Sequence, residues 1–190
     1  MPQRDIVSRL AYVHCVTVIE AFLMYAARAM LSLPPYLARF HERKERFIHS
    51  EKKRNALDKT HKKDRERLAK PTPSVSAYVT LPPTRTGDYM DTVRNTVGAM
   101  TFHNVGHIER YFSAMLSTPP DWPLDETFKA IIETRQDLVH RNGITKEERQ
   151  VVINTHDLEL ALCTMRRFIT LANADFQAEA ARYLAPEQGF

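Results

Sequence analysis

The sequence predicts an all-α fold: an antiparallel bundle of four to five helices, formed by one domain that spans all 190 residues. Apolar residues recur at intervals of three and four in several long stretches, as one buried helix face requires. The chain has only five glycines, and its one Asn-Gly pair, Asn142-Gly143, follows a helical pattern, which argues against an all-β fold. A hydrophobic content of 43% is sufficient for one core.

The first helix is expected from about Asp5 to Leu31 and ends before Pro34-Pro35, since proline cannot continue a helix. The stretch from Ala11 to Leu33 is apolar enough to raise the question of a membrane span or a signal sequence. However, Glu20 lies at its centre, and a charge at mid-bilayer costs roughly 2.5–3.5 kcal/mol. We therefore expect a buried helix and no membrane association.

The segment from His41 to Lys70 differs from the rest in composition, with 12 Lys and Arg, 6 Asp and Glu, and few apolar residues. Acid–base pairs one turn apart, such as Glu42 with Arg46, favour a helix with little to bury. We expect an insertion at about 41–88: a basic helical or partly disordered arm, then an irregular connection with an extended piece at Val75–Leu81. The arm is either a solvated surface or a patch that attracts phosphate backbones.

Two further helices are expected from about Tyr89 to Ala99 and from about His103 to Leu116. His103 and His107 stand four apart, a spacing that metal ligands use. Asn104 stands where a metallohydrolase signature has Glu, so surface or interface histidines are expected there.

Cys15 and Cys163 lie in apolar helical stretches and are predicted to be buried thiols, typical of a reducing compartment. Neither has a second Cys or His at zinc-finger spacing. The sequence also has no P-loop, dinucleotide-binding glycine pattern or nucleophile elbow. We expect a cytoplasmic protein without a metal or other cofactor.

The last third of the chain begins with a proline-rich loop whose Trp122 is expected to dock on the bundle. Asp125 is the expected N-cap of the next helix. Beyond that helix two interpretations stay open: Thr145–Glu148 as a capping box that starts a helix, or Val151–Ile153 as a short extended piece. A clear helical pattern runs over His156–Leu184.

The helix that Asp125 starts carries Arg135 at the centre of its apolar face. On a helical wheel the residues within about 60° of it are Phe128, Ile131, Ile132, Leu138 and Val139. An arginine in a core-facing stripe is costly unless it has a partner or a function. Arg135 therefore has either a structural role or a functional one. The structural role would be a buried pair with Glu20 or a place in a dimer interface. Glu20 itself either pairs with a basic residue or orients Arg135 or His140.

His140 follows Arg135 after four residues, directly before the Asn142-Gly143 helix stop. The spacing alone indicates little, because five Arg–His pairs in this chain have four to six intervening residues. These are Arg9–His14, Arg43–His49, Arg54–His61, Arg135–His140 and Arg149–His156. Only the pair Arg135–His140 combines an arginine on a core stripe with a histidine at a helix end.

The stretch R-Q-D-L-V-H-R-N-G, Arg135 to Gly143, resembles the signature of the HEPN superfamily, in which Arg, four to six residues and His lie in a four- to five-helix domain. The helix V-T-V-I-E-A-F-L around Glu20 and the stretch T-F-H-N-V-G-H-I-E-R-Y-F are similar to those of the RiboL-PSP-type HEPN group. The resemblance covers most of the chain outside the range His41–Asp88.

The resemblance implies a metal-independent endoribonuclease that acts as a homodimer, with the two motifs facing each other in a cleft. His140 would transfer a proton from the ribose 2′-hydroxyl or to the leaving oxygen, and Arg135 would hold the phosphate. The supporting residues would be Gln136, Asp137, Arg141, Asn142 and Glu20. The implied partners are RNA, a second copy of the chain, and an antitoxin or a component of a defence system.

Two motif positions depart from the family pattern. Gln136 stands where the family usually has Asn, Asp or His, and Asn142 replaces a tyrosine that partner nucleotidyltransferases modify in some toxin pairs. A second interpretation follows: a catalytically inactive HEPN module that binds nucleotide or protein and mediates dimerisation.

Overall fold

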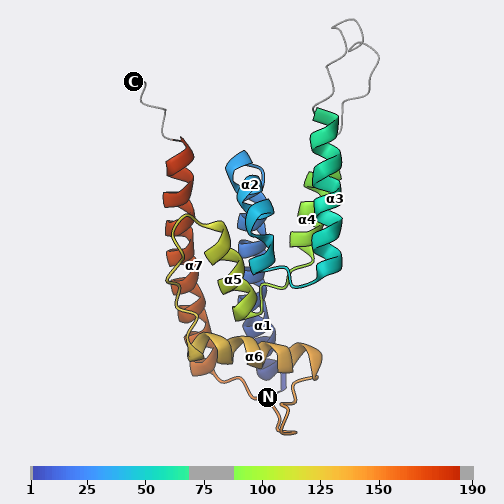
Figure 1. Ribbon diagram of the computed structural model, residues 1–190. Helices are drawn as coiled ribbons and strands as arrows, with labels where there is room; N and C mark the ends of the chain where they lie inside the picture. The colour runs from blue at the N-terminus through green and yellow to red at the C-terminus, as the bar shows by residue number, and fades with distance from the viewer. Residues whose placement is uncertain (1, 69–87, 185–190) are drawn as a thin grey trace, which may run out of the picture.

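The computed structural model describes residues 2–68 and 88–184, and this part of the chain is an all-α helical bundle without a strand (Figure 1). The helices are α1 (Pro2–Met30), α2 (Pro34–Arg43), the 3₁₀ turn η1 (Lys44–Arg46), α3 (Glu51–Leu68), α4 (Asp88–Gly98), α5 (Val105–Met115), α6 (Glu126–His140) and α7 (Thr155–Leu184). The predicted all-α class is confirmed. The described part has seven α-helices, because α2 and α3 are present beside the five helices that the sequence predicted for the bundle.

The two longest helices, α1 and α7, pack together and run in the same direction, from the lower to the upper end in Figure 1. Helix α6 lies across the lower end and contacts both of them. Helices α3 and α4 pack side by side in opposite directions, and α2 packs against α5. The lower end therefore brings together the start of α1, the whole of α6 and the start of α7.

Helix α1 contributes one continuous stripe to the core, as the four- and three-residue spacing predicts. The stripe consists of Tyr12, Val16, Ile19, Leu23 and Ala27, all buried. Residues Asp5–Met30 are also long and apolar enough to cross a membrane by length and composition, a test that core helices pass as well. The predicted buried helix is confirmed along this stripe only, because Ile6, Val7, Leu10 and Tyr25 on α1 are exposed.

The basic segment is helical where the structure describes it. Helix α3 is anchored by Leu57, which is fully buried and contributes about 1.5–3 kcal/mol of burial energy. Phe47 and Ile48, just before α3, are buried as well. This segment therefore buries more than its composition predicts, and it packs on α4 instead of standing alone in solvent. The extended piece expected at Val75–Leu81 lies outside the described residues.

Trp122 docks on the bundle as predicted, with 7% of its surface exposed. Its ring packs against Phe112, Phe168 and Phe176, at centroid distances of 5.0, 5.4 and 5.6 Å. The indole Nε1 donates to Asp175 Oδ2 at 2.8 Å, which satisfies its only polar group.

Buried Glu179 ties α7 to the opposite side of the bundle. Its Oε1 accepts from Ser117 N at 3.0 Å, from Ser117 Oγ at 2.6 Å and from Arg39 Nη1 at 3.1 Å. The three donors come from α2 and from the residue after the α5 C-cap. A carboxylate that accepts this many bonds stays charged although it is buried.

The chain from 141 to 154 is a turn rather than a helix start. Ile144 and Gln150 form an antiparallel bridge, and Glu148 has φ 60°, which no right-handed helix allows. The helix predicted from Thr145–Glu148 is therefore wrong, and the extended alternative holds. The reciprocal cap at the start of α7 is instead made by Asn154 and Asp157, whose side chains each accept from the other's backbone N–H, at 3.0 and 2.9 Å.

The two cysteines differ in environment. Cys15 is half-buried on α1, and Cys163 is exposed on α7; both are free thiols. The prediction of two buried thiols is wrong for Cys163, because the buried face of α7 carries Ala161 and Met165, whereas Cys163 lies on the opposite side with exposed Leu160.

Candidate functional site at the end of helix α6

Helix α6 starts where the sequence predicts, with Asp125 Oδ1 accepting from Phe128 N at 3.0 Å. Its apolar stripe runs from buried Phe128, Ile131 and Ile132 to half-buried Leu138 and to Val139, which is 44% exposed. Arg135 lies on this stripe where it leaves the core, and its side chain is 12% exposed. The wheel therefore placed Arg135 correctly on the apolar face, and the structure adds that this part of the face lies where α6 leaves the core.

Arg135 forms the ion pair with Glu20 that the sequence raised as one explanation. The Nη2 of Arg135 donates to Glu20 Oε2 at 3.1 Å, across 115 residues of sequence. Glu20 lies on α1 between buried Ile19 and Leu23, and its side chain is 23% exposed. The second oxygen of Glu20 contacts Nδ1 of His103. One carboxylate thus joins α1 to α6 and to the residue that precedes the α5 N-cap.

The guanidinium of Arg135 is incompletely satisfied in the single chain. Its Nε is buried and has no hydrogen-bond partner among the described residues. An unsatisfied buried donor costs about 1–3 kcal/mol, so such groups are rare outside functional sites and interfaces. Glu20 therefore fixes the position of Arg135 without using all of its donors.

His140 is the last residue of α6 and is exposed. The chain reverses directly after it, through Asn142 at φ 55° and Gly143 at φ 78°. Gly143 is favoured here by its positive φ, and a Cβ at this position would lie 2.9 Å from Arg9 Nη1, the end of a flexible side chain. The N-terminal part of α1 therefore packs on the turn that ends the motif.

The remaining motif residues support the helix end. Asp137 forms an ion pair with Arg141, and its backbone oxygen accepts from Arg141 N at 3.2 Å and Gly143 N at 2.9 Å. This is the hydrogen-bonding pattern of a helix that ends in a left-handed residue. Gln136 is half-buried and Asn142 is exposed.

The structure brings only part of the predicted site together. Glu20 contacts Arg135 but not His140, and within the described residues no hydrogen bond or ion pair joins Arg135 to His140. In one chain, therefore, the arginine is held within the bundle and the histidine faces solvent.

His103 and His107 do not form a pair. Asn104 is the N-cap of α5, with its Oδ1 accepting from His107 N at 3.2 Å, so His103 precedes the helix. His103 turns to Glu20, whereas His107 Nδ1 lies 3.1 Å from Thr101 Oγ1. No group of three or more His, Cys, Asp or Glu in the described ranges is arranged to hold a metal ion. The sequence interpretation missed His103 as a site residue. Asn104 is a good N-cap residue, and an N-cap at this position would have placed His103 before the helix.

Comparison of the chain with family models, with curated proteins and with solved structures found no match.

Proposed function

We propose that this protein is a metal-independent endoribonuclease of HEPN type. It cleaves RNA in a cleft between two copies of the chain, with Arg135 and His140 as catalytic residues. The ribose 2′-oxygen bonds to phosphorus while the bond from phosphorus to the 5′-oxygen breaks, giving a 2′,3′-cyclic phosphate and a 5′-hydroxyl. One proton leaves the 2′-hydroxyl and one is supplied to the 5′-oxygen.

The observation that carries this proposal is the apolar surface around the motif. Eight of the thirteen exposed large hydrophobic side chains among the described residues belong to the first turns of α1, the end of α6, the following turn and the start of α7. They are Ile6, Val7, Leu10, Val139, Ile144, Val152, Leu160 and Leu162. These segments lie at the lower end of the molecule in Figure 1. Exposed apolar side chains concentrated at one end of a molecule are typical of protein interfaces.

A second copy docked at this end would bury the cluster and bring two copies of the motif near each other. His140 is exposed, as a residue that exchanges a proton with RNA must be. Arg135 is held by Glu20 in a fixed orientation, which suits a group that stabilises charge on phosphate. A symmetric contact of one surface with itself is the commonest form of homodimer.

One observation favours a second candidate, a catalytically inactive HEPN module that binds nucleotide or protein and mediates dimerisation. Arg135 is only 12% exposed and already has an anionic partner in Glu20. In that function the ion pair is purely structural, and the apolar end of the molecule is the interface.

Purified protein incubated with RNA in EDTA distinguishes the two functions. We expect chelator-resistant cleavage that falls by at least about 100-fold in His140→Ala, the typical size of a lost acid–base group. Because Arg135 also contacts the fold through Glu20, Arg135→Lys is measured beside Arg135→Ala, with circular dichroism as a check of folding. Arg149→Ala and His156→Ala, both exposed, remove another Arg–His pair with similar spacing and should cleave normally.

The products and the assembly give independent tests. RNA with 2′-deoxyribose at the scissile position should resist cleavage, because it lacks the attacking hydroxyl. Leu10→Glu should yield a monomer with lost cleavage, whereas Tyr25→Glu, on an exposed residue further along α1, should not. Cleavage that persists unchanged in His140→Ala would refute the nuclease and leave the binding module.

A ribonuclease of this kind acts on RNA in the cytoplasm, and we place it as a toxin or antiphage defence effector with an antitoxin or defence-system partner. Induced expression of the wild-type chain in a bacterial host should then arrest growth, while His140→Ala should not. Equal growth of the two strains at equal protein levels would argue against this assignment.

A further inference from the structure

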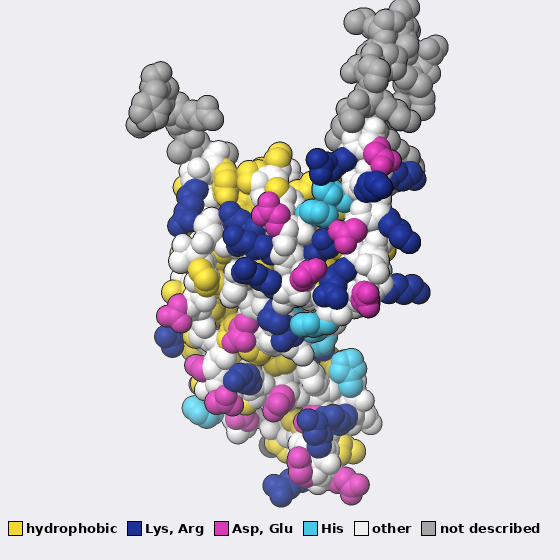
Figure 2. Space-filling view, in the orientation of Figure 1, with side chains coloured by type: hydrophobic (Ala, Val, Ile, Leu, Met, Phe, Trp, Pro, Cys, Tyr) yellow, Lys and Arg dark blue, Asp and Glu magenta, His cyan; other side chains and the backbone are white. Residues whose placement is uncertain are grey.

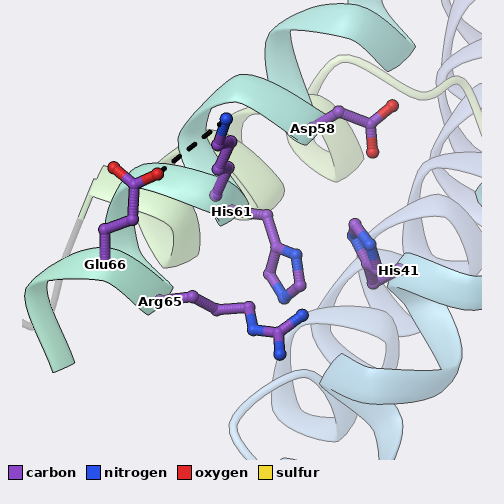
Figure 3. A pocket seen from close by; sticks show the side chains of 6 residues that line it. His41, Asp58, His61, Arg65 and Glu66 are labelled. Carbon is purple, nitrogen blue, oxygen red and sulfur yellow. Dashed lines mark ion pairs between the residues drawn. The ribbon is translucent and has the colours of Figure 1, made fainter. Parts of the chain in front are cut away.

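A hollow lies between α2 and α3, on segments far along the chain from the motif Arg135–Gly143. Its volume is about 430 Å³. The side chains that line it are His41, Asp58, His61, Lys62, Arg65 and Glu66 (Figure 3). All but His41 come from α3, and on the face shown in Figure 2 Lys and Arg side chains gather along this helix, with histidines beside them.

Two histidines form the wall of the hollow. The rings of His41 and His61 are stacked with centroids 3.7 Å apart and planes inclined by 29°. His41 Nδ1 lies 3.1 Å from the hydroxyl of Tyr89, which is buried on α4. The imidazoles are therefore held in place by three helices, and His41 retains Nε2 for another partner.

The lining of the hollow carries two basic side chains, Lys62 and Arg65, and two acidic ones, Asp58 and Glu66, but the carboxylates already have lysine partners. Asp58 is paired with Lys44 at 2.8 Å, and Glu66 lies 3.9 Å from Lys62, so both lining carboxylates have a lysine. Arg65 has no ion-pair partner among the described residues, and its guanidinium points toward the ring of His61 (Figure 3). One guanidinium and two imidazoles thus converge, and among the described residues the guanidinium has no ion-pair partner.

We propose that this hollow binds a phosphate group, with the guanidinium of Arg65 and the N–H groups of His61 and His41 as donors. Arginine offers two parallel N–H groups that match the oxygens of phosphate, and the hollow is larger than one phosphate requires, so a phosphorylated ligand also fits. This assignment is independent of the proposed ribonuclease function, since it uses none of its residues.

Protonation of the two histidines should favour binding. Burial, helped by Lys44 and by the neighbouring His61, lowers the pKa of His41; burial, helped by Arg65 and Lys44, lowers the pKa of His61. The charged groups that face the two histidines are Glu42 on α2, Lys44 on η1, and Asp58, Asp64 and Arg65 on α3. The hydroxyl of Tyr89 on α4 also faces them. A bound phosphate adds negative charge, which raises both pKa values. By linkage, proton uptake by the two histidines strengthens phosphate binding as the pH falls from 8 toward 6, and protonation of the phosphate itself, with a second pKa of about 6, opposes this.

The test is titration calorimetry on the full chain with three phosphate sources: inorganic phosphate, a nucleoside 5′-monophosphate, and a short 2′-O-methyl oligonucleotide with a 5′-phosphate. The 2′-O-methyl groups prevent cleavage by 2′-hydroxyl attack, so the result does not depend on nuclease activity. The same oligonucleotide with a 5′-hydroxyl is the reference. The source with the lowest Kd identifies the class of ligand.

We expect at least one of the three sources to bind, with an affinity that falls about 10-fold or more in Arg65→Gln, as loss of a charge-assisted contact predicts. Arg54→Gln, which removes the same charge on α3 outside the hollow, should change the affinity less than twofold. Binding should weaken from pH 6 to pH 8, where the histidines lose their protons. In proton NMR spectra at pH 6 the ligand should shift the ring signals of His41 and His61.

Three results would overturn the assignment. The first is equal weakening in Arg65→Gln and Arg54→Gln, which would show a diffuse basic surface. The second is the absence of binding at pH 6 by all three sources. The third is binding of the 5′-hydroxyl oligonucleotide as tight as that of its phosphorylated form, with no effect of inorganic phosphate or the monophosphate.

Discussion

Replacement of Glu20 by Gln removes the only anionic partner that Arg135 has among the described residues. Breaking a fully buried pair from one side costs 3–5 kcal/mol, because a buried charge remains uncompensated. Here the side chains are 12% and 23% exposed, so water screens part of the charge, and the Gln oxygen still accepts one hydrogen bond. We therefore expect Glu20→Gln to lower the free energy of unfolding by about 2 kcal/mol.

Urea unfolding measures this loss with two probes. Circular dichroism follows the helices, and fluorescence follows Trp122, the only tryptophan of the chain, which is 7% exposed in the folded state. The matched control is Glu126→Gln, which breaks the pair between Glu126 and Lys129, whose side chains are 90% and 46% exposed. Its unfolding midpoint should equal that of the wild type.

A double-mutant cycle then isolates the pair. Glu20→Gln, Arg135→Gln and the double variant should give a coupling free energy above about 1 kcal/mol, since the two groups are in direct contact. Coupling below about 0.5 kcal/mol, or a midpoint of Glu20→Gln equal to that of the control, would show that the pair does not stabilise the bundle.

Three further predictions concern the turn, the buried carboxylate and the thiols. Gly143→Ala should destabilise the fold by roughly 1–2 kcal/mol in urea unfolding, because φ is +78° there, while Gly106→Ala in the first turn of α5 should have little effect. Burial raises the pKa of Glu179, but its hydrogen bonds from Ser117 and Arg39 outweigh burial and lower it overall. This group therefore adds stability above the pKa of an unfolded Glu, and the contribution is lost as pH falls through the lower folded value. Melting temperatures should fall less steeply with acid in Glu179→Gln than in the wild type; identical pH slopes would contradict this. A thiol reagent should modify exposed Cys163 first, whereas half-buried Cys15, whose pKa is raised by burial, should react at a comparable rate only after unfolding.

The sequence was most informative where structure is local. Asp125 caps α6 through a bond to a backbone N–H three residues away, and the pattern of α7 depends on its own periodicity. The same periodicity placed Arg135 on the apolar face, and Asn142-Gly143 marked the helix stop that the positive φ values show. Each of these features is fixed by residues within one or two helical turns.

Only the tertiary structure decided which faces meet. The apolar stretches that contain α1 and Cys163 were expected to be buried, but periodicity does not reveal which side of a helix another helix covers. Thr145–Glu148 matched a capping box, yet the bridge from Ile144 to Gln150 left that stretch as a turn. Local sequence signals compete with long-range contacts. The arrangement that buries more apolar surface or satisfies more polar groups prevails.

The chemistry of both sites depends on such long-range contacts. The sequence supplied Glu20 and Arg135 as partners in principle, but His103 joined them only because three segments of the bundle converge at one carboxylate. The stacking of His41 on His61 likewise follows from the packing of α3 beside α2. The two residues are about twenty positions apart, in a segment whose composition is that of a solvated arm. The sequence by itself determined most of the helices and the residues able to carry chemistry. Their pairing was decided by the fold, because contact between side chains on different helices is a property of packing and not of spacing along the chain.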